Sequence, residues 1–523
     1  MIFLIVLNMI MFLAFLVFFA FNTLKSIHMF QLNSYKLPTH IRWLRSNSKC
    51  LLPGMIGALA VGGLLVSSVP EIIAVPITAV IFIVLAITQR PRKAKKPLVY
   101  TKRVIRLILT IALLLIITAA LTLCSRSKIA VGIAVALLAL LSPVIALAAN
   151  VINMPVEHGI KQYYIHDAKR ILADCPDLLT IGVTGSYGKT SVKYILHSLL
   201  QAEYDVLMTP ESYNTPMGVV MTVRNLLRAT HQIFVCEMGA RHVGDIKELC
   251  DIVHPDIGII TSVGPQHLET FHTIENVMKT KFELADAVSE HGKLFLNGED
   301  TNIQTYRSSY GKAAVSYGLS DRCDYYASDI SVSSKGTAFT VHTPAGECET
   351  FTTRLLGKHN VINIVGAIAI CHGLGIALAK LKPQVWKLES VPHRLQMLCR
   401  GGITIIDDAY NSNPAGSRAA IDTLALFEGF KILVTPGMVE LGEKQDELNK
   451  AFGAYAAKTC DYVILVGKRQ TVSIYDGFMS GGYPAEKIYV ADNLQDAFSK
   501  LHTVDSLGKE KIVLIENDLP DNF

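Results

Sequence analysis

The chain has 523 residues, of which half are hydrophobic and only 18% are charged, and this balance is too apolar for an ordinary soluble enzyme. Lys and Arg number 49 against 44 Asp and Glu, and much of this small excess lies in two loops near the N-terminus, which argues against nucleic acid as a partner. The ten cysteines include no Cys-x-x-Cys pair, which disfavours a zinc ribbon or a disulfide framework and favours reduced thiols.

The apolar residues are concentrated before residue 151 and predict a membrane part. A membrane-spanning helix needs about 20 apolar residues. The candidate spans are Met1–Leu24, Leu51–Ser68, Ile72–Ile87, Val104–Cys124 and Ile129–Ile152. The first of them has neither a basic leader nor a small-residue cleavage site, so a removable signal peptide is disfavoured. Buried helices of a soluble domain are the alternative for the shorter runs.

Basic loops predict how these five spans are oriented. The segments Lys25–Lys49 and Arg90–Arg103 are rich in Lys and Arg, and such loops stay on the cytoplasmic side of a membrane. Five spans then place the N-terminus outside and everything after residue 152 in the cytoplasm. Arg126 and Lys128 fall on the outer side, against the rule. We expect a multi-pass protein of the cell membrane.

The remainder of the chain has the pattern of an α/β protein. Residues 153–177 mix aromatic and basic side chains and predict a linker or an interfacial helix. From Leu178 onward, short β-branched runs alternate with helical patterns, which predicts a doubly wound parallel sheet. We expect a central domain at residues 178–393 and a Rossmann-like C-terminal domain at 394–523. Ligands of such sheets bind at the carboxyl ends of strands.

A phosphate-binding loop follows the first strand of this part. Its residues are Thr184, Gly185, Ser186, Tyr187, Gly188, Lys189, Thr190 and Ser191. The two glycines allow backbone N–H groups to approach a triphosphate, and the following helix adds free donors at its N-terminus. Lys189 can neutralise β and γ phosphates, and the Thr190 hydroxyl can bind Mg²⁺. An ordinary glycine turn is the alternative interpretation.

Two polar side chains follow later strands and are candidates for the same site. Glu237 ends the apolar run that begins at Ile233, where a carboxylate can hold Mg²⁺ or orient water. His267 follows the strand pattern at Ile257, although a lone histidine is usually structural. Asn214 precedes a helix in a turn-rich segment, for which a plain turn explains the residues equally well.

The motif order resembles the Mur ligase family, whose members use ATP to make peptide bonds in cell-wall precursors. The compact core Thr184-Gly185-x-x-Gly188-Lys189-Thr190 is shorter than the common phosphate-binding loop and is typical of that family. Further matching segments are Asn214–Gly218, Glu237, His267–Glu269, Lys281–Leu284, Asn297–Asp300, Gly357–Asn363, His393–Gln396 and Asp407–Pro414. The last segment closely resembles the branch of the family that adds D-alanyl-D-alanine.

The resemblance implies ATP and two Mg²⁺ ions as cofactors. Thr190 and Glu237 would hold the first ion. His267 and Lys281 would hold the second, with Lys281 carbamylated by CO₂ so that it offers an anionic oxygen. The family pattern assigns the remaining nucleotide contacts to Asn360 at the adenine, Arg394 and Asp408 at phosphate or ribose, and Tyr410 and Asn411 near the reacting phosphate. Helix N-capping is the alternative role for Asn360.

The sequence departs from the family in two places that concern substrate recognition. Membrane helices occupy the position of the soluble domain that binds the UDP-sugar in other members. The terminal strand runs into Glu516, Asn517 and Asp518, where the D-alanyl-D-alanine-adding branch has Lys-Gly-Ser-Arg. Likewise Thr435-Pro436-Gly437 lacks an aspartate of the matching element. We therefore expect retained ATP chemistry with altered recognition of the substrate.

The function implied is an ATP-dependent amide ligase that acts at the membrane through an acyl phosphate. Its partners would be a carboxylate-bearing envelope precursor, an amino acid or dipeptide, and membrane lipid. One alternative is a polymer-forming ligase of the same fold, such as one that makes poly-γ-glutamate. Another is an ATP-driven transporter or sensor, which requires polar residues inside the spans. A regulatory protein that binds ATP without turnover is disfavoured by the metal set.

Overall fold

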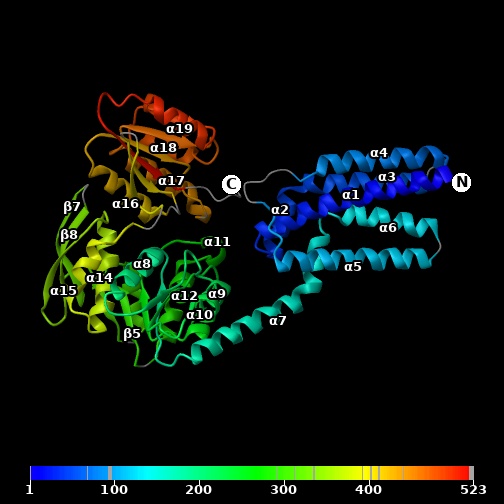
Figure 1. The fold of residues 1–523 in the computed structure, drawn as a ribbon. Helices are drawn as coiled ribbons and strands as arrows, with labels where there is room; N and C mark the ends of the chain where they lie inside the picture. The colour runs from blue at the N-terminus through cyan, green and yellow to red at the C-terminus, as the bar shows by residue number, and fades with distance from the viewer. Residues whose placement is uncertain are drawn as a thin grey trace. The chain divides into compact units, whose positions relative to one another are not determined.

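The computed structural model describes residues 2–66, 69–91, 97–125, 127–289, 291–310, 313–333, 336–390, 393–400, 403–409, 413–439 and 441–517. The chain divides into two compact units, Met1–Tyr163 and Tyr164–Phe523 (Figure 1). The first unit is helical, and the second contains two sheets with helices around them. Each unit is considered in turn.

The first unit is built from long apolar helices. They are α1 (Ile2–Leu32), α3 (Leu52–Val66), α4 (Glu71–Gln89), α5 (Lys102–Cys124), α6 (Lys128–Leu141) and the start of α7 (Ile145–Ala173), with the short α2 (Leu37–Ser46) after α1. Within the described residues, four helices are long and apolar enough to cross a membrane, and a fifth span results if the bent pair α6 and α7 is counted as one. Four of the five predicted runs thus form such helices.

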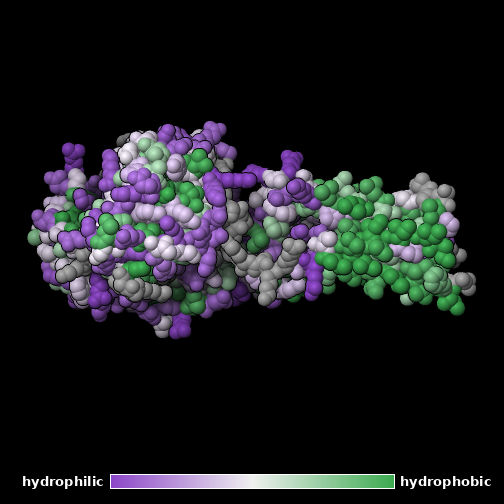
Figure 2. Space-filling model, turned by 90° about the horizontal axis from the view of Figure 1, so that it is seen from above, coloured by the Kyte–Doolittle hydropathy of each residue, from purple (hydrophilic) through white to green (hydrophobic). Residues whose placement is uncertain are grey.

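The outer surface of these helices is apolar (Figure 2). On α5 alone, Leu109, Ile116 and Leu121 are each more than 60% exposed. Burying one such side chain is worth about 1.5–3 kcal/mol, so a surface of this kind is unfavourable in water and suits a lipid environment. The interior is aromatic, because Phe82 of α4 packs against Phe15 and Phe18 of α1 with ring centroids 5.4 and 5.7 Å apart.

The fifth predicted run, Ile129–Ile152, is broken and not a straight span. The chain bends by 85° between α6 and α7, at a break that contains Ser142 and Pro143. Proline has no backbone N–H, so carbonyl groups at the break lose their helical partners. The polar face of α1 meets this need, since Ser26 Oγ donates to the Pro143 carbonyl at 2.6 Å and Asn22 Nδ2 donates to Ser142 Oγ at 2.7 Å.

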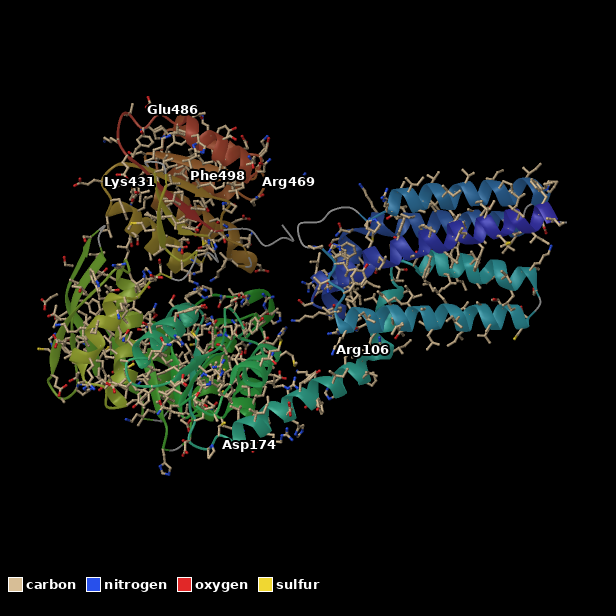
Figure 3. The ribbon with its side chains drawn as sticks, in the orientation of Figure 1. Arg106, Asp174, Lys431, Arg469, Glu486 and Phe498 are labelled. Carbon is tan, nitrogen blue, oxygen red and sulfur yellow. The ribbon has the colours of Figure 1, made fainter. Side chains whose placement is uncertain are left out.

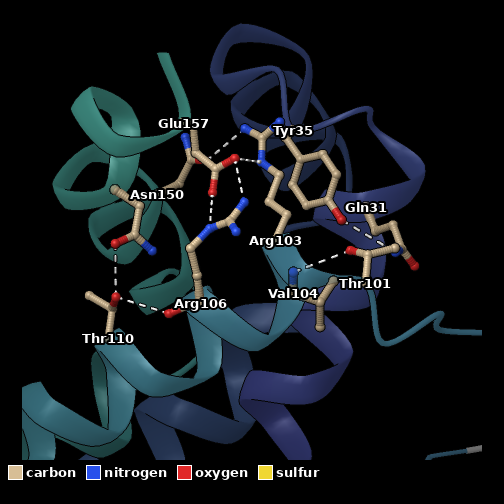
Figure 4. Close-up of polar contacts among 10 residues, drawn as sticks. Gln31, Tyr35, Thr101, Arg103, Val104, Arg106, Thr110, Asn150 and Glu157 are labelled. Atoms are coloured by element: carbon tan, nitrogen blue, oxygen red, sulfur yellow. Dashed lines mark hydrogen bonds and ion pairs between the residues drawn. The ribbon is translucent and has the colours of Figure 1, made fainter. Parts of the chain in front are cut away.

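An ion pair joins α5 to α7 at the polar end of the first unit (Figure 4). Arg106 of α5 makes a bidentate contact with the Glu157 carboxylate, at 2.7 and 2.9 Å. Arg103 donates to Asn150 at 3.1 Å and stacks on the Tyr35 ring at 4.0 Å. Residues 153–177 were expected to form a linker or an interfacial helix. As far as Ala173 they continue α7, and Glu157 near the start of this segment contacts α5.

The central domain is a nine-stranded sheet in the order β2-β3-β1-β4-β5-β6-β7-β8-β9. All neighbours from β2 to β7 in this order pair in parallel, whereas β7 (Tyr325–Ser333), β8 (Gly336–His342) and β9 (Cys348–Thr353) form an antiparallel meander. The strands β2 (Val206–Met208), β5 (Lys293–Asn297) and β6 (Val315–Gly318) complete the sheet. The strands that concern the site are β1 (Leu179–Thr184), β3 (Ile233–Glu237) and β4 (Ile257–Ile260). Strand β1 lies between β3 and β4, so their carboxyl ends are neighbours.

Helices α8 (Lys189–Leu200), α12 (Ile274–Ala287) and α14 (Lys358–Gly373) carry further site residues. Apolar residues of α8 and α14 form one core with the strands; for example, Val192, Leu196 and Ile368 are fully buried. The sheet and these helices therefore hold the first turn of α8 in a fixed place at the carboxyl edge.

The C-terminal domain has a six-stranded sheet in the order β10-β11-β15-β12-β13-β14, all parallel except β10 with β11. Strands β11 (Ile403–Asp408), β12 (Phe430–Thr435), β13 (Tyr462–Val466) and β15 (Lys511–Glu516) form its centre. Lys431 lies near the amino end of β12, and Arg469 lies beyond the carboxyl end of β13, so the two residues mark opposite ends of the parallel strands (Figure 3). Both sheets confirm the predicted doubly wound α/β fold.

We predict that replacing Arg106 with Met lowers the unfolding temperature of the purified protein in detergent. The substitution leaves the Glu157 carboxylate, only 17% exposed, without its bidentate partner. A fully buried pair loses about 3–5 kcal/mol in this way and an exposed one about 1 kcal/mol or less, so a loss between these limits is expected.

The double variant Arg106→Met with Glu157→Met should recover much of the loss. The matched control is Lys128→Met, because the pair between Lys128 and Glu71 is equally short at 2.9 Å but its side chains are 85% and 50% exposed. Equal destabilisation by the Arg106 and Lys128 variants would contradict this account.

Candidate active site

The glycine turn between β1 and α8 has the geometry of a phosphate-binding loop. Gly188 precedes α8 with φ of 80°, a left-handed conformation that favours glycine. A Cβ on Gly185 would collide with Thr261 Oγ1 of the neighbouring loop. The first turn of α8 contains Lys189, Thr190 and Ser191, whose backbone N–H groups have no partner within the helix and are available to an anion.

The loop itself is pinned by the segment that follows β4. Ser186 N donates to the Ser262 carbonyl at 2.7 Å, and Tyr187 N donates to Ser262 Oγ at 2.8 Å. Ser186 Oγ and Gly264 are hydrogen-bonded in both directions, and Tyr187 OH donates to Pro265 O. Thr184 Oγ1 donates to the Met238 carbonyl. Thr184, Ser186 and Tyr187 thus hold the turn in shape through bonds to protein groups. The N–H groups at the start of α8 are the ones that can bind phosphate.

Lys189 folds back over the loop that precedes it. Its Nζ donates to the carbonyls of Gly185 at 2.7 Å and Ser186 at 3.0 Å. Burial lowers the pKa of Lys189 to about 8, although the nearby Glu237 carboxylate opposes this effect. An ammonium held by two neutral carbonyls can exchange them for phosphate oxygens at little cost.

Glu237 is the central carboxylate of the site. It ends β3, is 1% exposed, and its Oε1 accepts hydrogen bonds from Thr190 Oγ1 and Asn214 Nδ2, both at 3.1 Å. Burial by itself raises its pKa, but Lys193 and Lys189 outweigh burial and hold the pKa of Glu237 below its ordinary value. The carboxylate is therefore ionised and faces the hydroxyl of the phosphate-binding loop.

Lys281 lies on α12 and is 1% exposed. Burial, assisted by the positive charge of Lys189, lowers the pKa of the Lys281 amine well below its ordinary value. A neutral amine is the form that reacts with CO₂, so the surroundings of Lys281 suit the carbamate expected from the sequence.

His267 follows β4 and starts the short helix α11 (Leu268–Phe271), with a left-handed φ of 52°. Strand β4 is adjacent to β1 on the side away from β3, so His267 belongs to the same edge of the sheet. In the described parts of the chain, no group of three or more His, Cys, Asp and Glu side chains could hold a metal ion by itself.

Mg²⁺ and ATP fit the side chains at this position. Mg²⁺ prefers hard oxygen ligands and is usually held by one or two carboxylates together with substrate phosphates. The Thr190 hydroxyl and the Glu237 carboxylate supply two such oxygens 3.1 Å apart, next to the free N–H groups at the start of α8. A bound Mg²⁺ would supply charge neutralisation for phosphoryl transfer at this point.

Residues of the C-terminal domain also reach the site. Arg394 Nη2 donates to Thr190 Oγ1 at 3.3 Å. Asp408 ends β11, accepts from the Leu395 backbone N–H at 3.1 Å, and has its pKa raised to about 6 by burial. His393 Nδ1 lies 2.7 Å from Asp407 Oδ2. The segment that links the domains is therefore held by the two consecutive aspartates.

The helix α14 brings an asparagine to the phosphate-binding loop. Asn360 Nδ2 donates to the Leu356 carbonyl at 2.8 Å, and the N-cap residue of α14 is Gly357, so Asn360 is not the cap. Asn363, one turn further, lies against Gly188, where an added Cβ would meet its Oδ1 at 3.0 Å. The spacing of the two residues places both on one helix face.

Three contacts were not predicted as site features. Lys193 pairs with Glu237, Asn214 bonds to Glu237, and Asn363 contacts Gly188. The i, i+4 spacing of Lys189 and Lys193 on α8 could have indicated the first. The predicted Asn297–Asp300 element braces the loop after β4, since Asn297 Nδ2 donates to Thr261 O and Asp300 accepts from Val263 N. Tyr410 and Asn411 lie outside the described residues.

Comparison with known families gives two matches. Residues 183–371 match the Mur ligase middle domain, and residues 393–516 match the Mur ligase glutamate ligase domain. The UDP-N-acetylmuramoyl-tripeptide–D-alanyl-D-alanine ligase of Bacillus subtilis is 34% identical over 292 residues, 55% of this chain and 62% of that protein. The enzyme of that name from Escherichia coli is 30% identical over 61% of this chain and 73% of its own.

Solved structures agree with the sequence matches. MurF from Acinetobacter baumannii has a TM-score of 0.62 at 25% identity and covers 68% of this chain and 77% of its own. MurF ligase from Thermotoga maritima in complex with ADP has a TM-score of 0.61 at 26% identity, with 68% and 80% covered. The chain spans about three fifths of the length of the B. subtilis relative.

The half-buried His359 predicts a pH dependence of stability. Burial lowers its pKa to about 4, from an ordinary value near 6.5. The native state then binds fewer protons than the unfolded state between these values, so stability rises with pH across that window and is lost as the pH falls through it.

We expect His359→Gln to flatten the unfolding temperature between pH 4.5 and 6.5 relative to the unchanged protein. The control is His242→Gln, because the His242 side chain is 53% exposed and should leave the pH profile intact. A His359 variant with the original slope would refute the assignment.

Proposed function

This chain belongs to the Mur ligase family, and we propose that it is an ATP-dependent ligase that joins a carboxylate to an amine at the membrane surface. The observation that carries the proposal is the contact of Thr190 with Glu237 beside Lys189, at the start of α8. These groups are the ones that a magnesium nucleotide requires.

The proposed reaction activates a poor electrophile. A carboxylate of the substrate attacks the γ-phosphorus of ATP, ADP leaves, and the amine then displaces phosphate from the acyl phosphate. Lys189 and the N–H groups of α8 would stabilise the charge on the transferring group. Arg394, already in contact with Thr190, would hold the nucleotide when the C-terminal domain closes and excludes water.

The family relatives suggest the substrate class. The relatives from B. subtilis and E. coli are named as ligases of a UDP-N-acetylmuramoyl-tripeptide and D-alanyl-D-alanine. We infer that this chain uses a related envelope precursor and an amino acid or dipeptide. Because apolar helices stand where those relatives have other sequence, a lipid-linked precursor on the cytoplasmic face of the membrane fits best.

A transporter is less well supported. The transport alternative needs polar side chains in the spans that serve a pathway. The buried residues Thr23 and Ser26 of α1 instead donate to the backbone carbonyls of Ser142 and Pro143, and Asn22 donates to the Ser142 hydroxyl. Within the described residues, these polar groups have a structural use.

The decisive experiment is ADP release by purified full-length protein, supplied with ATP, Mg²⁺, candidate precursors and D-alanyl-D-alanine. We expect release that depends on both carboxylate and amine, with the amide product seen by mass spectrometry. Lys189→Met should reduce turnover by about a hundredfold or more, because transition-state charge loses its main cation. Glutamate-dependent chain growth would identify the polymer-forming alternative, and ATP hydrolysis indifferent to any amine would refute a ligase.

A second expectation concerns the carbamate on Lys281. Removal of CO₂ and bicarbonate should lower the rate, and isotopically labelled bicarbonate should give a carbamate signal in the unchanged protein that Lys281→Ala lacks. Lys279→Ala is the control, because Lys279 lies on the same helix but is exposed. An unaltered rate in CO₂-free buffer, with no carbamate signal, would exclude carbamylation.

A further inference from the structure

Lys193 is a buried cation for which the ATP-binding pattern has no use. It lies one turn beyond Lys189 on α8, and its side chain is 0% exposed. Its Nζ is 3.0 Å from Glu237 Oε2 and donates to the Glu211 carbonyl at 2.5 Å. A buried ammonium is stable only where fixed acceptors replace the water that it loses. The position of the Lys193 ammonium is therefore set by these two acceptors.

The two oxygens of Glu237 have different partners. Oε1 accepts from Thr190 Oγ1 and Asn214 Nδ2, and it faces the phosphate-binding loop. Oε2 faces Lys193. The carboxylate therefore presents one oxygen to the threonine that would bind a nucleotide's metal ion, and its other oxygen is taken by a cation of the protein.

Lys193 is prevented from turning away by its second contact. The Glu211 carbonyl belongs to the loop between β2 (Val206–Met208) and α9 (Pro216–Leu226), and Glu211 has a left-handed φ of 40°. The same loop supplies Asn214 to Glu237, and Asn214 O accepts from Gly239 N. The loop is thus fastened at two points, and it holds the ammonium over Oε2.

We propose that Lys193 is a positioning residue that restricts Glu237 to a one-oxygen contact with the metal ion of the bound nucleotide, and thereby selects Mg²⁺ over Ca²⁺. Mg²⁺ takes six ligands in tight octahedral geometry, which one carboxylate oxygen suits. Ca²⁺ takes six to eight oxygens and gains from a carboxylate that binds through both. With Oε2 occupied, the larger ion loses that gain.

The inference rests on the proposed function only in taking a metal–nucleotide complex as the ligand. The test is therefore ADP binding by the full-length protein in detergent, measured by calorimetry with Mg²⁺ or Ca²⁺ as the sole divalent cation. The unchanged protein should bind ADP more tightly with Mg²⁺. Lys193→Met frees Oε2, and the ratio of the two affinities should fall by about tenfold.

Two further variants separate selectivity from folding. Lys193→Gln is one atom shorter and can keep a polar contact in the pocket, so it should fold where Met does not and should also lower the ratio. Lys193→Arg keeps a cation and should retain the Mg²⁺ preference. Lys279→Met removes an exposed lysine and should leave the ratio unchanged.

A ratio that is the same in the unchanged protein, the Gln variant and the Met variant overturns the inference while leaving the proposed function intact. A lowered ratio in the Arg variant also overturns it, because the cation would then be immaterial. The absence of ADP binding with either metal ion would instead count against the proposed function.

Discussion

The ionised carboxylate of Glu237 at the end of a buried strand is the interaction on which the catalytic unit depends. A charge that is 1% exposed is tolerable only when cations and hydrogen-bond donors surround it. The surrounding groups come from two separate parts of the chain: Thr190 and Lys193 from α8, and Asn214 from the loop before α9. The requirement to satisfy one carboxylate therefore assembles the nucleotide site before any nucleotide arrives.

Backbone hydrogen bonding imposes the corresponding rule on the first unit. Lipid provides no partner for a carbonyl, so a break in a spanning helix has to be satisfied by protein. The carbonyls of Ser142 and Pro143 accept from Thr23 and Ser26 of α1, and Asn22 donates to the Ser142 hydroxyl, which explains why a helix so apolar carries a polar stripe. Such residues look like a transport pathway in sequence, and only the contacts reveal a structural role.

The sequence predicted the order of elements well because periodicity and glycine placement are local properties. The strand, glycine turn and helix around Gly188 follow from nearest neighbours, and so does the carboxylate that ends β3. The pairing of Lys193 with Glu237 could not be predicted, because the residues are 44 positions apart and a lysine on a helix is normally solvated. The position of Asn363 beside Gly188 could not be predicted for a related reason, since only tertiary packing brings this side chain to the loop.

The fifth predicted span shows what composition alone does not reveal. Ile129–Ile152 is apolar enough to cross a membrane, yet a single proline near its middle divides it into two helices 85° apart. A hydropathy average over the segment hides this proline, although the missing backbone N–H interrupts the helix. The second helix then turns its polar residues toward α5, where Glu157 meets Arg106, so that the segment expected to be a linker is anchored by a bidentate ion pair.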